Sequence, residues 1–302
     1  MLIKHLPPFN KNVSTIIGLS AVLFWSTNVG LIREVSLSFG AVAGAALIYS
    51  VASIILYFTI GFPYKGVISK SYLIMGSLFF VACELCFTLS IGYAHDATQA
   101  IEVGMINYLW PTLTLTLAVI FNGLKANFLI IPGFILAFIG IGWVVSGDGL
   151  DLIQLSNNLK DNPISYILAF SSALCWAIYC TITMRISKGV NLVSLFFTLC
   201  AITLWIKYAM LGAHPLVFNW ENIRTLLFAS GALGLGYAAW NIGLLAGNVN
   251  VLAGASYFTP ILSAFFAAIF LNTTLSSSFW YGVIMVTGGA ICCWLATRKN
   301  NL

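Results

Sequence analysis

The sequence predicts an all-α integral membrane protein in which ten transmembrane helices form two inverted five-helix repeats. Three observations lead to this prediction. The chain of 302 residues is 60% hydrophobic and only 7% charged, whereas soluble domains carry about 25% charged residues. Its apolar residues fall into runs of about 20, which is the length that crosses a bilayer as a helix. Matching residues also recur in the two halves at a nearly fixed spacing.

Ten apolar segments are expected to cross the membrane, separated by charged residues or by Gly, Pro and Asn turn signals. The first run is too long for the apolar core of a signal peptide, so we expect it to be retained. The longest connection, 147–163, divides the chain into a first repeat at 1–150 and a second at 151–302. The expected spans are 13–32, 40–60, 71–94, 99–121, 127–146, 164–184, 191–211, 222–246, 250–271 and 277–296.

The direction of the spans follows from the lysines and arginines in short loops, which concentrate on the cytoplasmic side of membrane proteins. An N-terminus inside the cell places nine of these residues in the cytoplasm and four outside. We therefore expect a multi-pass protein with both termini in the cytoplasm. The inside set is Lys4, Lys11, Lys65, Lys70, Lys125, Arg185, Lys188, Arg298 and Lys299, and the outside set is Arg33, Lys160, Lys207 and Arg224.

The two halves resemble each other at an offset of 149 residues. Because each half has an odd number of spans, the second half enters the membrane upside down relative to the first. Inverted repeats are typical of secondary transporters, whose substrate site lies near the midplane between the halves. The pairs at this offset include Tyr108 with Tyr257, Pro111 with Pro260, Gly133 with Gly282 and Gly140 with Gly289.

The segment QAIEVGMINYLWPTL (99–113) places polar residues and a proline inside an apolar run. Proline has no N–H, so Pro111 frees the carbonyl of Asn107 and Pro260 frees that of Ser256. In lipid such groups must be satisfied by protein, water or a ligand. They are either ordinary kinks satisfied by neighbouring helices or a matched pair facing a shared cavity. The matched polar neighbours favour the cavity.

Two carboxylates fall within predicted spans. Glu84 lies near the centre of 71–94, where a charge costs at least ~2.5 kcal/mol, so it should face a cavity or a partner. Proton exchange, binding of a substrate ammonium and a structural hydrogen bond are all open to it. Glu102 lies one turn inside the end of its span, where a structural acceptor, a charge at a helix N-terminus and a substrate contact are equally open.

Aromatic and amide side chains recur near the middle of several spans, away from the interfaces where Trp and Tyr are ordinary anchors. For the group as a whole we favour a cavity wall over simple packing. The predicted substrate cavity comprises Trp25, Asn28, Glu84, Asn107, Tyr108, Trp110, Trp176, Tyr179, Tyr237, Trp240, Asn241, Ser256 and Tyr257.

Small residues are expected to let helix backbones approach one another. The glycines concerned are Gly40, Gly44, Gly133, Gly140, Gly282 and Gly289. Gly234-Leu235-Gly236 resembles part of a dinucleotide fingerprint, but no strand precedes it, so we assign it to packing.

Other function classes find little support in the sequence. The basic residues are scattered singly, which argues against binding of nucleic acid. No HExxH or GxSxG motif occurs, so we expect no enzyme, no metal site and no cofactor.

The chain resembles the EamA-type carriers of the drug/metabolite transporter (DMT) superfamily, and among them the YddG-like exporters of aromatic amino acids. The resemblance covers nearly the whole chain. It implies a carrier in the bacterial inner membrane that expels phenylalanine, tyrosine and tryptophan to the periplasm. The segments that carry it are FWSTNVGLIREVS (24–36), GYAHDATQAIEVGMINYLWP (92–111), GYAAWNIG (236–243), SYFTPILS (256–263) and CCWLATRK (292–299).

The chemistry of the candidate residues agrees with this resemblance. Aromatic rings stack on Trp and Tyr, and amides, Glu84 and freed carbonyls would serve a zwitterion. A carrier for other amino acids, small metabolites or amphipathic drugs is the alternative, because one fold serves many substrates. A channel would need a continuous polar stripe, and an embedded enzyme a catalytic set; the spans show neither. Coupling to protons and oligomeric state stay open, and a monomer is compatible with the sequence.

We predict that cysteines introduced singly at Lys125 and Asp151 label from opposite sides of the membrane, because the two positions lie on opposite sides in the expected topology. An impermeant thiol reagent applied to whole cells should reach position 151, and position 125 only after permeabilisation. Equal labelling of both positions in intact cells would contradict the topology.

Overall fold

The computed structural model describes residues 10–61, 68–147, 149–188 and 190–298, and within them the chain is helical with no strand. The loop charges Lys4, Lys65 and Lys299 lie outside these residues. The helices are α1 (Lys11–Ser26), α2 (Asn28–Phe39), α3 (Ala41–Thr59), a π-helical turn (Tyr72–Gly76) leading into α4 (Ser77–Gly92), α5 (Ala97–Asn107), α6 (Trp110–Asn122), α7 (Ile130–Ser146), α8 (Leu152–Asp161), α9 (Pro163–Ile186), α10 (Val193–Met210), α11 (Trp220–Ala246), α12 (Val249–Ser256), α13 (Thr259–Phe270) and α14 (Ser277–Arg298).

The chain is an all-helical protein with many segments able to cross a membrane. In the described residues, seven helical stretches are long and apolar enough, and two bent pairs raise the number to nine. The remaining apolar helix, α7, has 17 residues. Each of the predicted spans coincides with a helix or with two consecutive helices.

Two of the helix breaks lie beside the prolines singled out in the sequence. Helix α5 ends at Asn107 and α6 begins at Trp110, with Pro111 in its first turn. Helix α12 ends at Ser256, and α13 begins at Thr259 with a bend of 50° between them. A proline is tolerated in the first turn of a helix, because the N–H groups of that turn have no partner within the helix. A third break, the 44° bend between α1 and α2, contains no proline and was not expected.

The connection 147–163 contains a helix that was not predicted. Helix α8 has no buried residue, and its Leu152 and Ile153 side chains are exposed. Asp151 caps its N-terminus by accepting hydrogen bonds from the N–H groups of Ile153 and Gln154. Its apolar run is too short for a membrane span, so the criteria that predict spans do not identify this helix.

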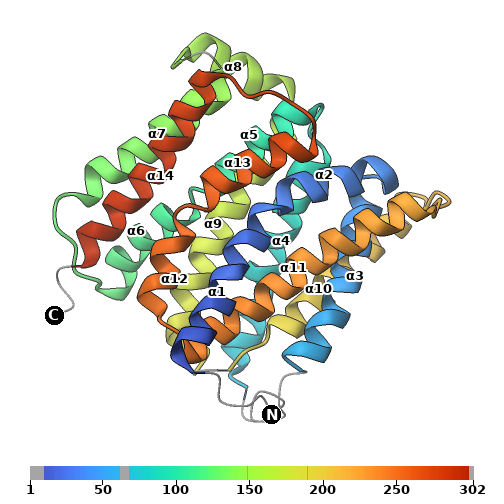
Figure 1. Cartoon of the computed structure of the whole chain (residues 1–302), viewed down its shortest axis with the longest axis horizontal. Coiled ribbons are helices and arrows are strands. Elements are labelled where there is room, and N and C mark those ends of the chain that lie inside the picture. Colours follow the sequence, from blue (N-terminus) through green and yellow to red (C-terminus); the bar gives the residue numbers. More distant parts are fainter. Residues whose placement is uncertain (1–9, 62–67, 148, 189, 299–302) are drawn as a thin grey trace.

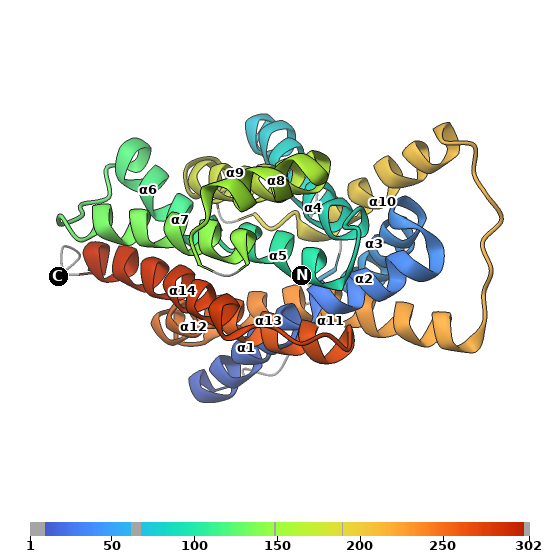
Figure 2. The same cartoon turned by 90° about the horizontal axis from the view of Figure 1, so that it is seen from above.

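The helices form one elongated bundle (Figure 1). Helices α7 and α14 lie side by side along one flank, and α3, α10 and α11 lie at the other, with α1 and α9 between them (Figure 2). Helix α8 lies at the opposite end of the bundle from the start of α1.

The contact between α7 and α14 depends on the predicted glycines. A Cβ added to Gly140 would lie 2.8 Å from the carbonyl oxygen of Gly282, and one added to Gly289 would lie 2.6 Å from that of Gly133. These distances leave no space for a side chain, so the two backbones touch in an antiparallel pair. The expectation of close helix packing is confirmed for these four glycines.

The other two glycines of that prediction differ from each other. A Cβ at Gly44 would lie 3.0 Å from the carbonyl oxygen of Val35, so this position is closely packed. Gly40 has no neighbour within 4 Å of an added Cβ, and its φ is 81°. The prediction was wrong for Gly40, which serves the sharp turn between α2 and α3 that side chains with a Cβ rarely adopt.

We predict that Gly289→Ala lowers the stability of the protein by about 1–3 kcal/mol, the usual cost of overpacking a closed contact. The midpoint of thermal unfolding in detergent should fall. Gly231→Ala is the matched control, because nothing lies within 4 Å of a Cβ added there in α11. Equal midpoints for the two variants would show that the glycine contact between α7 and α14 does not limit stability.

Candidate functional site

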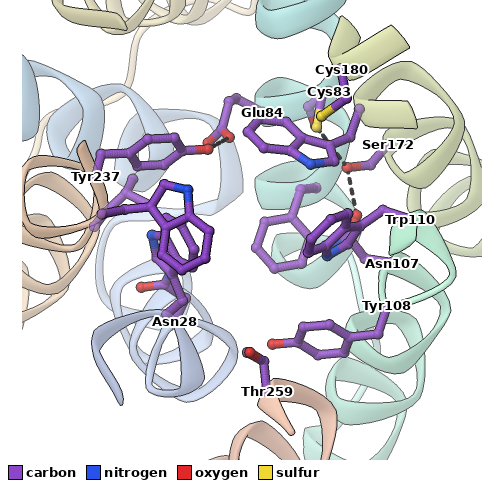
Figure 3. Close-up of a pocket in the computed structure, with 15 residues that line it drawn as sticks. Asn28, Cys83, Glu84, Asn107, Tyr108, Trp110, Ser172, Cys180, Tyr237 and Thr259 are labelled. Carbon is purple, nitrogen blue, oxygen red and sulfur yellow. Dashed lines mark hydrogen bonds between the residues drawn. The ribbon is translucent and has the colours of Figure 1, made fainter. Parts of the chain in front are cut away.

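A cavity of about 250 Å³ lies between the helices of the two halves (Figure 3). Its volume is slightly below the ~300–1,000 Å³ that is usual for ligand pockets, so it has room for one small molecule. Helices α1, α2, α4, α5, α6, α9, α11 and α13 contribute to its wall. The lining residues are Trp25, Asn28, Cys83, Glu84, Phe87, Asn107, Tyr108, Trp110, Ser172, Trp176, Cys180, Leu233, Tyr237, Trp240 and Thr259.

Nine of the thirteen predicted cavity residues lie together in this wall, although they come from both halves of the chain. They are Trp25, Asn28, Glu84, Asn107, Tyr108, Trp110, Trp176, Tyr237 and Trp240. The four others, Tyr179, Asn241, Ser256 and Tyr257, lie outside it.

Each of these four residues has a partner away from the cavity. The Tyr179 ring packs against Phe80, with centroids 5.3 Å apart, and Asn241 Oδ1 accepts a hydrogen bond from Asn191 Nδ2 at 2.9 Å. The first belongs to the packed core and the second to a contact between amides, so neither residue lines this cavity.

The same holds for the pair beside the second proline. The Ser256 hydroxyl donates to the carbonyl of Ala253 at 2.8 Å, within its own helix. The Tyr257 ring lies 5.8 Å from that of Trp294. The helix break at this point turns both side chains away and brings Thr259 into the wall instead.

Aromatic rings form two connected sides of the cavity. On one side, the Trp25 ring centroid lies 5.1 Å from that of Trp240 and 5.4 Å from that of Tyr237. On the other, the Trp110 and Trp176 centroids are 6.2 Å apart. The sides meet where Trp176 lies 6.3 Å from Tyr237. These spacings are those of aromatic pairs that attract each other, so the walls hold their shape around the space.

Glu84 is the centre of a hydrogen-bond network in the wall. Its Oε1 accepts from the Tyr237 hydroxyl at 2.6 Å, and its Oε2 accepts from the Tyr49 hydroxyl at 2.7 Å. The Tyr49 oxygen also lies 2.8 Å from Thr88 Oγ1. Glu84 as a whole residue is only 5% exposed, and the network joins the first half of the chain to the second through Tyr237.

A second polar group lies across the cavity. Ser172 Oγ is 2.9 Å from both Asn107 Oδ1 and the carbonyl oxygen of Cys83. A hydroxyl has one proton, so Ser172 donates to one of them; turning the Asn107 amide over lets Nδ2 donate to Ser172 instead. Figure 3 shows this group opposite the Glu84–Tyr237 pair.

The freed carbonyl before Pro260 has a partner within the protein. The Thr259 hydroxyl donates to the Ser256 carbonyl oxygen at 2.7 Å. For this proline, the geometry therefore agrees with an ordinary kink satisfied by the protein, and not with a carbonyl offered to a ligand.

Glu102 also lies outside the cavity. It accepts a hydrogen bond from the Tyr166 hydroxyl at 2.6 Å. Nearby, Asn162 Nδ2 donates to Gln99 Oε1 at 2.7 Å. These contacts tie α5 to the start of α9, so of the roles left open by the sequence the geometry favours a structural acceptor.

Six wall residues were not predicted, and helical spacing could have found at least half of them. Ser172 and Cys180 lie one turn before and after Trp176, and Leu233 lies one turn before Tyr237. Side chains three or four positions apart share one face of a helix. The full set that was missed is Cys83, Phe87, Ser172, Cys180, Leu233 and Thr259.

Comparisons with known proteins agree on the kind of protein. Residues 163–295 match the EamA-like transporter family. An aromatic amino acid exporter YddG of Escherichia coli (strain K12) is 50% identical over 96% of this chain and 99% of its own length. The exporter of the same name from Salmonella typhimurium (strain 14028s / SGSC 2262) is 47% identical over 95% and 98%. A crystal structure at 19% identity shares the fold, with a TM-score of 0.64 over 97% of this chain and 99% of its own.

We predict that Thr259→Val destabilises the protein by about 1–3 kcal/mol, because it leaves the buried Ser256 carbonyl without a donor. Thermal unfolding in detergent measures the effect. Thr116→Val is the matched control. The Thr116 hydroxyl donates to the Thr112 carbonyl oxygen within α6, and this carbonyl still accepts the backbone N–H bond of the helix when the hydroxyl is removed. A loss of stability no greater than that of the control would mean that the Ser256 carbonyl does not depend on Thr259.

Proposed function

This chain belongs to the EamA-like transporter family, and we propose that it is a secondary transporter that exports aromatic amino acids across the bacterial inner membrane by alternating access. The observation that carries the proposal is the cavity between the two halves, walled by four tryptophans and by separate polar groups. Two relatives named as aromatic amino acid exporters are 50% and 47% identical to this chain over nearly their whole length.

The cavity suits the chemistry of an aromatic amino acid, which joins an apolar ring to a zwitterion. Trp25 and Trp240 on one side, and Trp110 and Trp176 on the other, offer faces on which a ring can stack, each contact adding about 0.5–1.5 kcal/mol beyond burial. Glu84 supplies acceptors, and the amides of Asn28 and Asn107 supply both donors and acceptors.

We further propose that the ten helical spans form two inverted five-helix repeats, at 1–150 and 151–302. The glycine contacts support this arrangement. The repeat relates Gly133 to Gly282 and Gly140 to Gly289, and the contacts observed are Gly133 with Gly289 and Gly140 with Gly282. Exchanging the halves turns each contact into the other, as a two-fold axis between inverted repeats requires.

The packing of the longer helices supports the same relation. Helix α1 packs along α11, and α9 packs along α4. In the proposed repeat α1 corresponds to α9, and α11 corresponds to α4, so the two contacts are equivalent. The cavity lies between these pairs, where rocking of one half against the other would open it to alternate sides.

The proposed topology has both termini in the cytoplasm. The bias of lysine and arginine in the loops supports it. The start of α1 and the end of α14 lie away from α8 (Figure 1), which agrees with α8 on the outer side.

Transport of labelled phenylalanine in proteoliposomes tests the proposal. We expect uptake that saturates with concentration and that unlabelled tyrosine or tryptophan inhibits. Repeating it with and without an imposed proton gradient separates proton-coupled from facilitated export. Inhibition by unrelated amino acids or amphipathic drugs alone would favour the broader DMT carrier.

Substitution of the cavity tryptophans tests their role in the same transport assay. Trp176→Ala and Trp240→Ala should each raise the half-saturating phenylalanine concentration several-fold, because a stacking partner is lost. Trp220→Ala is the control, since Trp220 is 78% exposed at the start of α11. Unchanged concentration dependence in both cavity variants would assign these residues to packing.

A further inference from the structure

We infer that Glu84 binds the ammonium group of the transported molecule, and that Tyr237 and Tyr49 hold its carboxylate in place for this purpose. The inference rests on the proposed function and deepens it, because it assigns which end of an amino acid the polar wall recognises. Of the three roles that the sequence left open for Glu84, it selects one.

The geometry of Glu84 leaves room for a ligand. One phenol donates to each carboxylate oxygen, at 2.6 Å from Tyr237 and 2.7 Å from Tyr49. An ionised carboxylate only accepts hydrogen bonds and has about four acceptor positions. The two phenols therefore orient the carboxylate and leave acceptor positions free, on a residue that lines the cavity (Figure 3).

The charges of the residues that line the cavity also favour binding of an ammonium group. Glu84 is the only Asp or Glu among the described lining residues, and these residues include no Lys, Arg or His. A buried charge needs a partner of opposite sign. A zwitterionic ligand supplies that partner with its ammonium group, whereas its carboxylate meets only neutral donors such as Asn28, Asn107 and Tyr108.

The aromatic residues beside Glu84 also favour a cation. A positive group is attracted to the faces of Trp and Tyr rings, and cages of such rings bind ammonium ligands. Around the hydroxyl-bearing ring of Tyr237, the Trp25 centroid lies at 5.4 Å and that of Trp176 at 6.3 Å. Glu84 thus bonds to the hydroxyl of one ring in a group of three contacting aromatic rings, which offers an ammonium ion both a charge and aromatic faces.

Two analogues of phenylalanine test the inference in the unaltered protein. Phenethylamine keeps the ring and the ammonium group but lacks the carboxylate, and 3-phenylpropionate keeps the ring and the carboxylate but lacks the ammonium. Both compete against exchange of labelled phenylalanine in proteoliposomes, at one pH and with no imposed gradient. We expect phenethylamine to inhibit at a concentration about tenfold lower than 3-phenylpropionate, or lower still.

The variant Glu84→Gln keeps the shape of the side chain but cannot ionise. The preference for phenethylamine should shrink about tenfold or more in this variant. Glu102→Gln is the control, because Glu102 is also a mostly buried acid bonded to a tyrosine but lies outside the cavity. It should keep the preference of the unaltered protein.

The outcomes separate the two proposals. If the unaltered protein exchanges phenylalanine but shows no preference for phenethylamine, the ammonium site is wrong and the transport function stands. If Glu84→Gln exchanges phenylalanine with the preference intact, the ammonium is bound elsewhere. If the unaltered protein exchanges no aromatic amino acid, the transport function fails, and the ammonium site falls with it. The comparison of the two analogues needs no variant, so the absence of a preference for phenethylamine overturns the ammonium site even if Glu84→Gln does not fold.

Discussion

The bilayer offers no water to a buried polar group, so each carboxylate, amide and freed carbonyl within this bundle needs a partner from the protein or from a ligand. Three such groups show how the structure meets this constraint. The carbonyl freed by Pro260 bonds to Thr259, and Glu102 bonds to Tyr166, so both are satisfied by the protein. Glu84 has two phenol partners and no cationic neighbour in the cavity wall as described. Groups whose partners all come from the protein belong to the structural framework, whereas Glu84, which has acceptor positions left for a ligand, belongs to the site.

Helix packing shows a matching division. In lipid, helices associate by close contact between small residues because the hydrophobic effect does not drive them together. The glycines of α7 and α14 make such a contact along one flank. Near the middle of the bundle, tryptophans and tyrosines keep the helices apart and enclose a space of about 250 Å³. Small residues therefore close one part of the bundle, while bulky aromatic residues hold another part open for a ligand.

The polar network also connects the halves that are proposed to move. Glu84 belongs to the first half and Tyr237 to the second, and their bond spans the cavity wall. Ser172 of the second half bonds to Asn107 or Cys83 of the first. A ligand that contacts these groups touches both halves at once. Binding can shift the balance between two arrangements only by favouring one of them, and contacts at this boundary are the ones able to do so.

The sequence by itself determined the class of the protein, the positions of its long apolar helical segments and the close packing of Gly133, Gly140, Gly282 and Gly289. The spacing of matching residues, the charges in the loops and the lengths of the apolar runs are properties of the sequence itself, so they can be recognised without knowing the fold. It also named nine of the wall residues, because polar and aromatic residues are costly or unusual at mid-span. Only the tertiary structure decided that Asn241 and Tyr257 face other partners, that Thr259 replaces Ser256, and that Ser172 joins the wall. Which face of a helix meets a cavity depends on its rotation and bends, and these are set by packing against helices distant in the sequence.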